Sequence, residues 1–217
     1  LTPERFTSKP VTPNLQAIAA IWSFKRELKF VLFAFLITLL IPVLAVILVA
    51  NIGLNIVSDK LVTLNPQTNT IEIHDPRTGQ VVKDLKITAV WPVSGVVTLE
   101  FGESNFPYQV LHTGIDIANP QGKIGDPVTP FMEGTITFAG QIPLGLGKHV
   151  TIDHGDNITS FYGHMSAVNA VKGQKVKPGD VIGLEGESGW ATGPHVHFQI
   201  NVYGIPVNPR TFLQGNP

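Results

Sequence analysis

The stretch Gly134-Thr-Ile-Thr-Phe-Ala-Gly140 sets the pattern of the C-terminal half of the chain, a short run of strand-forming residues bounded by glycine. β-Branched and aromatic residues favour strands, and the glycine-rich breaks between such runs mark turns. No segment here keeps an apolar period of 3.6 residues over three turns, as a helix would require. The pattern predicts an all-β domain, an antiparallel β-sandwich or barrel-like fold, over residues 89–217. The other runs of this kind are Val96–Leu99, His149–Asp153, Thr159–Tyr162, Val181–Leu184 and Val196–Ile200.

Composition excludes several classes of function. The 217 residues are 43% hydrophobic, which is enough for a sizeable core, and the net charge is only −1. Basic side chains are concentrated in residues 1–29, a distribution that indicates a membrane and not a nucleic acid as partner. The chain has no cysteine, which rules out disulfides, a thiolate metal site and a cysteine nucleophile.

Residues 30–51 are predicted to form one transmembrane helix that anchors the chain in a lipid bilayer. Phe30 to Ala50 carry no charge and, as a helix, would span roughly 31 Å, the thickness of a bilayer core. Two alternatives are a buried core helix and a cleaved signal peptide. A buried core helix would normally keep a polar stripe, which this run lacks. A signal peptide normally has a shorter apolar run followed by a small-residue cleavage site, and no such site is evident after Val49.

The charges beside the apolar run predict its orientation. Lys25, Arg26 and Lys29 lie directly before it, and positive charge is enriched on the cytoplasmic side of membrane helices. We therefore expect a single-pass protein of the cell membrane, with residues 1–29 cytoplasmic and everything after the helix outside.

Residues 52–88 are predicted to form an extracytoplasmic, β-rich spacer. Strand-like runs at 60–64, 70–74 and 81–85 are separated by turn signals at 65–69 and 75–79. A small meander or hairpin is expected, with His74 as a surface residue and not a metal ligand.

Two short motifs carry the chemistry, His112-Thr-Gly-Ile-Asp116 and His195-Val-His197. Two histidines and one carboxylate would leave the fourth position of a tetrahedral Zn²⁺ open for water, and one histidine would remain as a base. On a strand His195 and His197 would face the same way. His112 and Asp116 could meet only if the chain bends between them, which Gly114 permits. Nearby histidines in a protein of this size are often surface or core residues, so spacing alone predicts no more than a metal site.

The series of motifs resembles the LytM and lysostaphin type of zinc metalloendopeptidase. The resemblance covers residues 89–213 in order. It implies a compact antiparallel β fold with a groove across the sheet and a hydrolase that cuts peptide bonds of bacterial peptidoglycan. The matching segments are Trp91-Pro-Val, Phe101-Gly, His112 to Ala118, Gly134 to Gly140, Val150 to Gly155, Tyr162-Gly-His164, Gly189 to Gly193, Pro194 to Ile200 and Val207-Asn-Pro.

The resemblance also implies residue roles. His112, Asp116 and His197 correspond to the zinc ligands, His195 to the general base and His164 to the other catalytic histidine, which helps to stabilise the developing charge. All five positions keep the residue type that an active member of the family needs. The loops at 103–109 and 141–148 are expected to shape the groove walls.

Two functions follow as hypotheses. The first is a membrane-anchored zinc metalloendopeptidase that hydrolyses the peptide cross-links of peptidoglycan by zinc-activated water, with a histidine as general base. The alternative is a non-hydrolytic module that binds the cell wall or activates another hydrolase. No protein partner is indicated by the sequence.

Overall fold

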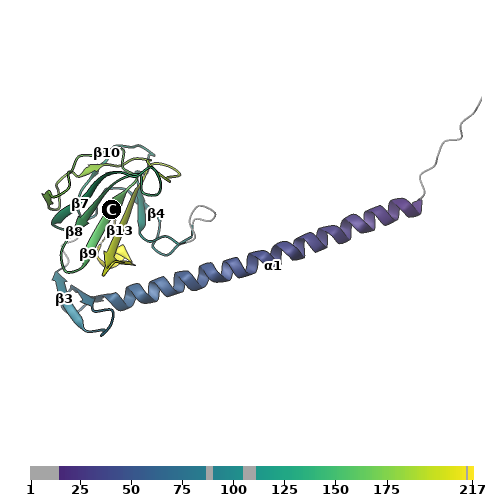
Figure 1. Ribbon diagram of the computed structural model, residues 1–217, viewed down its shortest axis with the longest axis horizontal. Helices are drawn as coiled ribbons and strands as arrows, with labels where there is room; N and C mark the ends of the chain where they lie inside the picture. The colour runs from purple at the N-terminus through teal and green to yellow at the C-terminus, as the bar shows by residue number, and fades with distance from the viewer. Residues whose placement is uncertain (1–14, 87–89, 105–110, 214) are drawn as a thin grey trace, which may run out of the picture. The chain divides into compact units, whose positions relative to one another are not determined.

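The computed structural model describes residues 15–86, 90–104, 111–213 and 215–217, with the backbone alone described for residues 15–23 (Figure 1). The described chain divides into two units between residues 46 and 47, and helix α1 (Leu15–Leu61) contributes to both.

The apolar helix is longer than the sequence predicted. It is continuous through Pro42, and Phe24–Leu61 is long and apolar enough to cross a membrane. Its most apolar window has a mean hydropathy of 3.1, and none of that window is buried within the described chain. A core helix of a soluble protein would be largely covered, so this window differs from such a helix and is a candidate membrane span.

The end of α1 belongs to the second unit. Leu54, Ser58 and Leu61 follow one another at helical spacing and turn towards the core of that unit, with Ser58 only 1% exposed. The Ser58 hydroxyl accepts a hydrogen bond from the Asn208 backbone N–H at 2.8 Å, and the Asn51 side-chain amide donates to the Gly102 carbonyl. This packing explains why the helix continues beyond residue 51, where the apolar run was expected to end.

The three strands after α1 form a small antiparallel sheet in the order β1-β2-β3. They are β1 (Val62–Asn65), β2 (Thr70–His74) and β3 (Val81–Lys86). Ile71 and Ile73 are buried in the same hydrophobic cluster as the rest of the unit. The predicted meander is therefore present, but it packs into the domain core because alternate side chains of β2 are apolar.

The main sheet contains eight strands in the order β11-β7-β8-β9-β13-β5-β4, with β14 also paired to β13, and every pairing is antiparallel. A smaller sheet has the order β10-β12-β6. The antiparallel β fold predicted from the sequence is confirmed.

The strands of the main sheet are β4 (Val96–Leu99), β5 (Ile115–Ala118), β7 (Gly134–Gln141), β8 (Lys148–Asp153), β9 (Ile158–Gly163), β11 (Lys175–Val176), β13 (Val196–Val202) and β14 (Ile205–Val207). The remaining elements are β6 (Pro127–Val128), β10 (Ala167–Val168), β12 (Gly183–Leu184) and the 3₁₀ helix η1 (Pro209–Thr211).

Strand β13 has one apolar and one polar face. Phe198, Ile200 and Val202 are completely buried and pack into the hydrophobic core. The alternate residues His197, Gln199 and Asn201 point to the opposite face, because successive side chains of a strand alternate. Burial of the first set therefore fixes the direction of the second.

A partly buried hydrogen-bonded chain of side chains lies outside the predicted metal motifs. His154 Nδ1–H donates to the Glu133 carbonyl at 2.7 Å, so its Nε2 is the acceptor for the Ser160 hydroxyl, also at 2.7 Å. Ser160 Oγ in turn lies 3.0 Å from the hydroxyl of Tyr162. Burial lowers the pKa of His154 because the imidazolium form is poorly solvated there.

The His154 chain predicts that acid destabilises the domain. The unfolded state takes up a proton near the ordinary pKa of 6.5 and the folded state only at lower pH, so unfolding is favoured as the pH falls below 6.5. His154 can contribute at most about 1.4 kcal/mol per pH unit. Urea unfolding of residues 47–217 at several pH values should show a shallower pH dependence in His154→Gln than in the wild type. Equal slopes would contradict the assignment.

Candidate metal centre

Strand pairing brings the predicted motifs together. His197 on β13 lies opposite Asp116 on β5 and, on its other side, opposite Gly163 at the end of β9. Directly opposed residues of antiparallel strands have side chains about 5 Å apart. His164, which follows β9, and His195, which precedes β13, are therefore placed beside the same pair.

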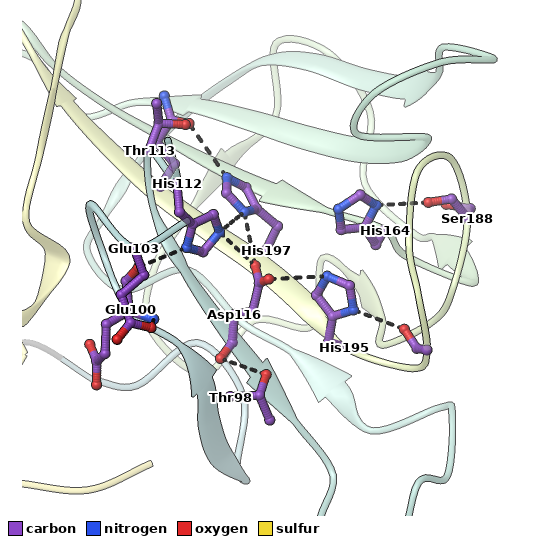
Figure 2. A network of polar contacts seen from close by, with 12 residues as sticks. Thr98, Glu100, Glu103, His112, Thr113, Asp116, His164, Ser188, His195 and His197 are labelled. Carbon is purple, nitrogen blue, oxygen red and sulfur yellow. Dashed lines mark hydrogen bonds and ion pairs between the residues drawn. The ribbon is translucent and has the colours of Figure 1, made fainter. Parts of the chain in front are cut away.

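Backbone hydrogen bonds hold the fifth residue, His112. Its N–H donates to the Glu103 carbonyl at 2.9 Å, and its carbonyl accepts from the Gly102 N–H at 2.7 Å. The imidazole Nδ1–H donates to the Glu100 carbonyl at 3.0 Å, and the whole residue is buried. His112 thus has one orientation, with Nε2 directed towards β5 and β13 (Figure 2).

Gly114 permits the bend between His112 and Asp116 that the sequence predicted. A Cβ atom at this position would lie 2.4 Å from the Phe198 carbonyl oxygen and 3.0 Å from Cε1 of His197. The glycine is therefore required by the close approach of β13, since its φ is not in the left-handed region.

Three donor atoms meet at the centre of the site. Nε2 of His112, Oδ1 of Asp116 and Nδ1 of His197 are separated from one another by 3.0, 3.0 and 2.9 Å (Figure 2). They form the group of histidine and acidic residues in the described chain that could hold a metal ion.

The outer hydrogen bonds bear on which nitrogens of the two rings are free. His112 Nδ1 faces the Glu100 carbonyl at 3.0 Å, so it carries the proton and Nε2 presents a lone pair. His197 faces an oxygen on each side, Asp116 Oδ1 at 3.0 Å from Nδ1 and Gln199 Oε1 at 3.4 Å from Nε2. A cation bound among the three central atoms places the His197 proton on Nε2, whereas without a cation a proton on Nδ1 would hydrogen-bond to the carboxylate.

A metal cation fits this donor set better than protons do. A zinc ion accepts electron pairs from two imidazoles and one carboxylate at once, whereas added protons would satisfy only some of the close contacts. Burial alone would raise the pKa of Asp116, yet hydrogen bonds and positive charge from His112 and His197 hold it well below its usual range, and a bound cation would act in the same direction. The carboxyl group is therefore ionised, as a metal ligand must be.

The other two histidines lie beside this group. His195 Nε2 is 3.6 Å from Oδ2 of Asp116, and its Nδ1–H donates to the Gly193 carbonyl at 2.8 Å. The ring centroids of His164 and His195 are 4.6 Å apart. The structure therefore brings together all five residues that the resemblance selected.

His164 is held in an uncommon backbone conformation, with a φ of +61°. Its Nδ1–H donates to the Ser188 carbonyl at 2.8 Å, and its own N–H donates to the Leu146 carbonyl. Burial lowers the pKa of His164 to about 4, so the ring is neutral at neutral pH with the lone pair on Nε2.

Four of the five residues, Asp116, His164, His195 and His197, line a groove of about 750 Å³, and His112 is buried. One wall comes from two loops joined by the hydrogen bond from the Trp190 N–H to the Gly145 carbonyl, 2.9 Å long. Gly145 and Leu146 line the groove, as expected for the 141–148 loop, and Trp190 is 71% exposed. Of the other expected loop, residues 105–109 lie outside the described residues.

Sequence reasoning missed the residues that orient the histidines. Gln199 contacts both His197 and Thr113, and Ser188 holds His164 through its carbonyl. Gln199 could have been found from the strand period, because it lies two residues after His197. The carbonyl acceptors had no sequence signal, since every residue has a carbonyl group.

Comparison with known proteins agrees with this geometry. Residues 110–209 match the sequence profile of peptidase family M23. The catalytic domain of the prophage-encoded M23 protein EnpA from Enterococcus faecalis is 37% identical, with a TM-score of 0.51, and the match covers 59% of this chain and 98% of that domain. The chain therefore belongs to peptidase family M23.

Two further similarities bear on function. The DD-carboxypeptidase/endopeptidase Mpg of Neisseria meningitidis is 44% identical over 107 residues, which are 49% of this chain and 24% of that protein. A chain in the crystal structure of the SpoIIIAH and SpoIIQ complex is 30% identical, with a TM-score of 0.52, and the match covers 58% of this chain and 100% of that one. The match to Mpg thus spans about a quarter of that protein.

Replacing Gly114 should disrupt the metal centre. A methyl group in Gly114→Ala would clash with backbone of β13, so β5 and β13 must separate at the point where Asp116 and His197 meet. We expect a loss of about 1–3 kcal/mol in the free energy of unfolding and weaker zinc binding. Thermal denaturation and zinc titration test this, with Gly53→Ala, where a Cβ meets nothing within 4 Å, as the matched control. Unchanged zinc affinity would show that the close approach is not required.

Proposed function

We propose that the chain is a membrane-anchored zinc metalloendopeptidase that hydrolyses the peptide cross-links of bacterial peptidoglycan. The observation that carries the proposal is the meeting of three potential ligand atoms, from His112, Asp116 and His197, beside two further histidines at an open groove. These three residues would hold zinc. When bound, zinc acts as a Lewis acid that polarises a carbonyl group and lowers the pKa of water towards neutrality.

His195 is assigned as the general base. Its Nδ1 proton is held by the Gly193 carbonyl, so Nε2 keeps a lone pair on the side of Asp116. The 3.6 Å between Nε2 and Oδ2 is too long for a good hydrogen bond, which leaves Nε2 available to take a proton from an attacking water. The proton can then pass from the same atom to the leaving amine.

His164 is assigned to the charge that develops on the substrate carbonyl oxygen. It presents Nε2 to the groove beside His195, with the two ring centroids 4.6 Å apart, because Ser188 holds the other nitrogen. As a neutral ring it contributes little repulsion to a nearby cation. Negative charge developing beside it would raise its pKa, so that Nε2 takes a proton from bulk water and donates a hydrogen bond to the oxyanion.

The groove supports a peptide substrate with small side chains. Gly145, Gly189 and Ala191 line it, so the backbone of a bound peptide can approach closely. Its other described lining residues include Leu146 and Trp190, which offer apolar contact area. The name of Mpg, a DD-carboxypeptidase/endopeptidase, supports peptidoglycan peptides as the substrate class.

The anchor supports a location at the cell surface. The unburied apolar helix and the basic residues Lys25, Arg26 and Lys29 favour a single-pass protein with a cytoplasmic N-terminus. The domain from residue 89 onward, together with the preceding strands, would then face the cell wall.

A second candidate is a module that binds a partner without hydrolysis. Similarity to a chain from the SpoIIIAH and SpoIIQ complex favours it, because that solved structure is an assembly of two proteins. The complete set of His112, Asp116, His164, His195 and His197 favours the enzyme, since a purely structural module has no need of two extra histidines with free nitrogens.

Two substitutions should separate metal binding from catalysis. His195→Ala should lower peptidoglycan hydrolysis roughly a hundredfold or more while zinc still binds, because only the proton acceptor is lost. Asp116→Ala should lose zinc and activity together, because a ligand is removed. Zinc content and the release of new amino groups from purified peptidoglycan are measured with the full chain in detergent.

His74→Ala and Asp84→Ala are matched controls outside the groove, and neither should change zinc content or hydrolysis. A folded wild type that binds no zinc and releases no amino groups would refute the enzyme. Retention of partner binding in the inactive variants would then favour the second candidate.

The membrane topology can be tested directly because the chain has no native cysteine. We expect Ser94→Cys to react with a membrane-impermeant maleimide in intact spheroplasts, and Ser8→Cys to react only after the membrane is opened. The reverse labelling would invert the proposed orientation. Recovery of the chain in the soluble fraction would refute the anchor.

A further inference from the structure

A row of three polar side chains continues from the metal centre along β13. His197, Gln199 and Asn201 lie two residues apart on the face opposite the core, and Gln199 also lines the groove. Gln199 lies on the outer side of His197, away from Asp116, where it meets the second ring nitrogen.

His197 must bind a cation through Nδ1, because that atom lies 3.0 Å from Asp116 Oδ1 and 2.9 Å from His112 Nε2. A neutral histidine can do so only if its proton is on Nε2. That nitrogen lies 3.4 Å from Oε1 of Gln199, the acceptor that it faces among the described residues. The contact is long, so its effect depends on how firmly Gln199 is held.

Two shorter hydrogen bonds hold the Gln199 amide. The Thr113 hydroxyl donates to Oε1 at 2.6 Å, and Nε2 of Gln199 donates to Oδ1 of Asn201 at 2.7 Å. Rotation of the amide by half a turn would place an NH₂ group against the His197 N–H and break the bond to Asn201. The oxygen of Gln199 is thereby kept towards His197.

The same contacts connect two parts of the metal centre. Thr113 follows His112 in the chain, and Gln199 follows His197 by two residues, so the bond between them joins the two segments that carry the histidines. Loss of Gln199 would remove the acceptor that favours the Nε2–H tautomer of His197, and it would also break this connection between the two segments.

We propose that Gln199 is a positioning residue, which fixes the Nε2–H tautomer and the ring orientation of His197 and so prepares the metal centre for zinc. This inference rests on the proposed zinc site and adds a residue to it. Outer hydrogen-bond partners of this kind raise the basicity of a metal-binding histidine and hold its ring in place.

The test compares Gln199→Leu, which removes the acceptor at similar size, with Gln199→Glu, which keeps it. Zinc dissociation constants of the full chain in detergent are measured by competition with a chromogenic chelator. We expect Gln199→Leu to bind zinc roughly 10–100-fold more weakly and Gln199→Glu to remain within a few-fold of the wild type. Thr113→Val, which releases one restraint on the amide, should show a smaller loss in the same direction.

A second measurement reports the Nε2–H group itself. Long-range ¹H–¹⁵N spectra of the zinc-loaded protein show the His197 Nε2–H and how fast its proton exchanges with water. The wild type and Gln199→Glu should show a slowly exchanging Nε2–H, while Gln199→Leu should lose this resonance through exchange, because its acceptor is gone. Gln67→Leu, in the exposed turn after β1, is the matched control and should change neither measurement.

The outcomes distinguish this inference from the proposed function. Zinc binding by folded Gln199→Leu within twofold of the wild type, with Nε2–H retained, overturns the positioning role alone. A rise in KM for peptidoglycan with unchanged zinc affinity also overturns it, since Gln199 would then contact substrate only. Failure of the wild type to bind zinc overturns the proposed function and this inference together.

Discussion

The register of β13 between β5 and β9 is the constraint on which the site depends. It places His197 opposite Asp116 on one side and opposite Gly163 on the other, so that three separate parts of the sequence meet at one point. A shift by one residue would turn His197 into the core and Phe198 into the groove. Burial of Phe198, Ile200 and Val202 opposes such a shift, because exposing each large apolar side chain costs about 1.5–3 kcal/mol.

The four histidines of the site share one hydrogen-bonding arrangement. Each ring has an oxygen acceptor on its far side, so that with a cation bound each ring can donate its proton outward and keep a lone pair on the inner nitrogen. The acceptors are the Glu100 carbonyl for His112, the Ser188 carbonyl for His164, the Gly193 carbonyl for His195 and the Gln199 side chain for His197. Three of the four are backbone carbonyls, which are fixed once the loops fold, so the site is prepared for a cation by the fold itself.

The end of helix α1 takes part in the support of this site within the second unit. The Asn51 amide donates to the Gly102 carbonyl, and the Gly102 N–H donates to the His112 carbonyl. Gly102 has a φ of +81°, and a Cβ atom there would lie 2.9 Å from the side-chain amide of Asn55. The segment between the predicted membrane span and the domain is thus an integral part of the fold that positions a candidate metal ligand.

Strand positions and the metal motifs were accessible from the sequence because their signals are local. The runs around 134–140, 149–153 and 196–200 became β7, β8 and β13, and the bend at Gly114 followed from the spacing of His112 and Asp116. The length of α1 was underestimated, because its last turns are held by packing against the domain and not by their own hydropathy. The same limit applied to the strands at 60–86, whose inclusion in the domain core depends on distant partners.

The sequence by itself determined which residue types were available for a metal centre, the family of peptidases to which the chain belongs and the apolar helix before it. Only the tertiary structure decided that Gln199 faces His197, that the Ser188 and Gly193 carbonyls orient His164 and His195, and that these side chains meet at one site. The physical reason is that hydrogen bonds to backbone carbonyls depend on where loops lie in space. The sequence specifies each side chain, whereas the fold specifies which acceptor atom lies next to the N–H of each histidine ring.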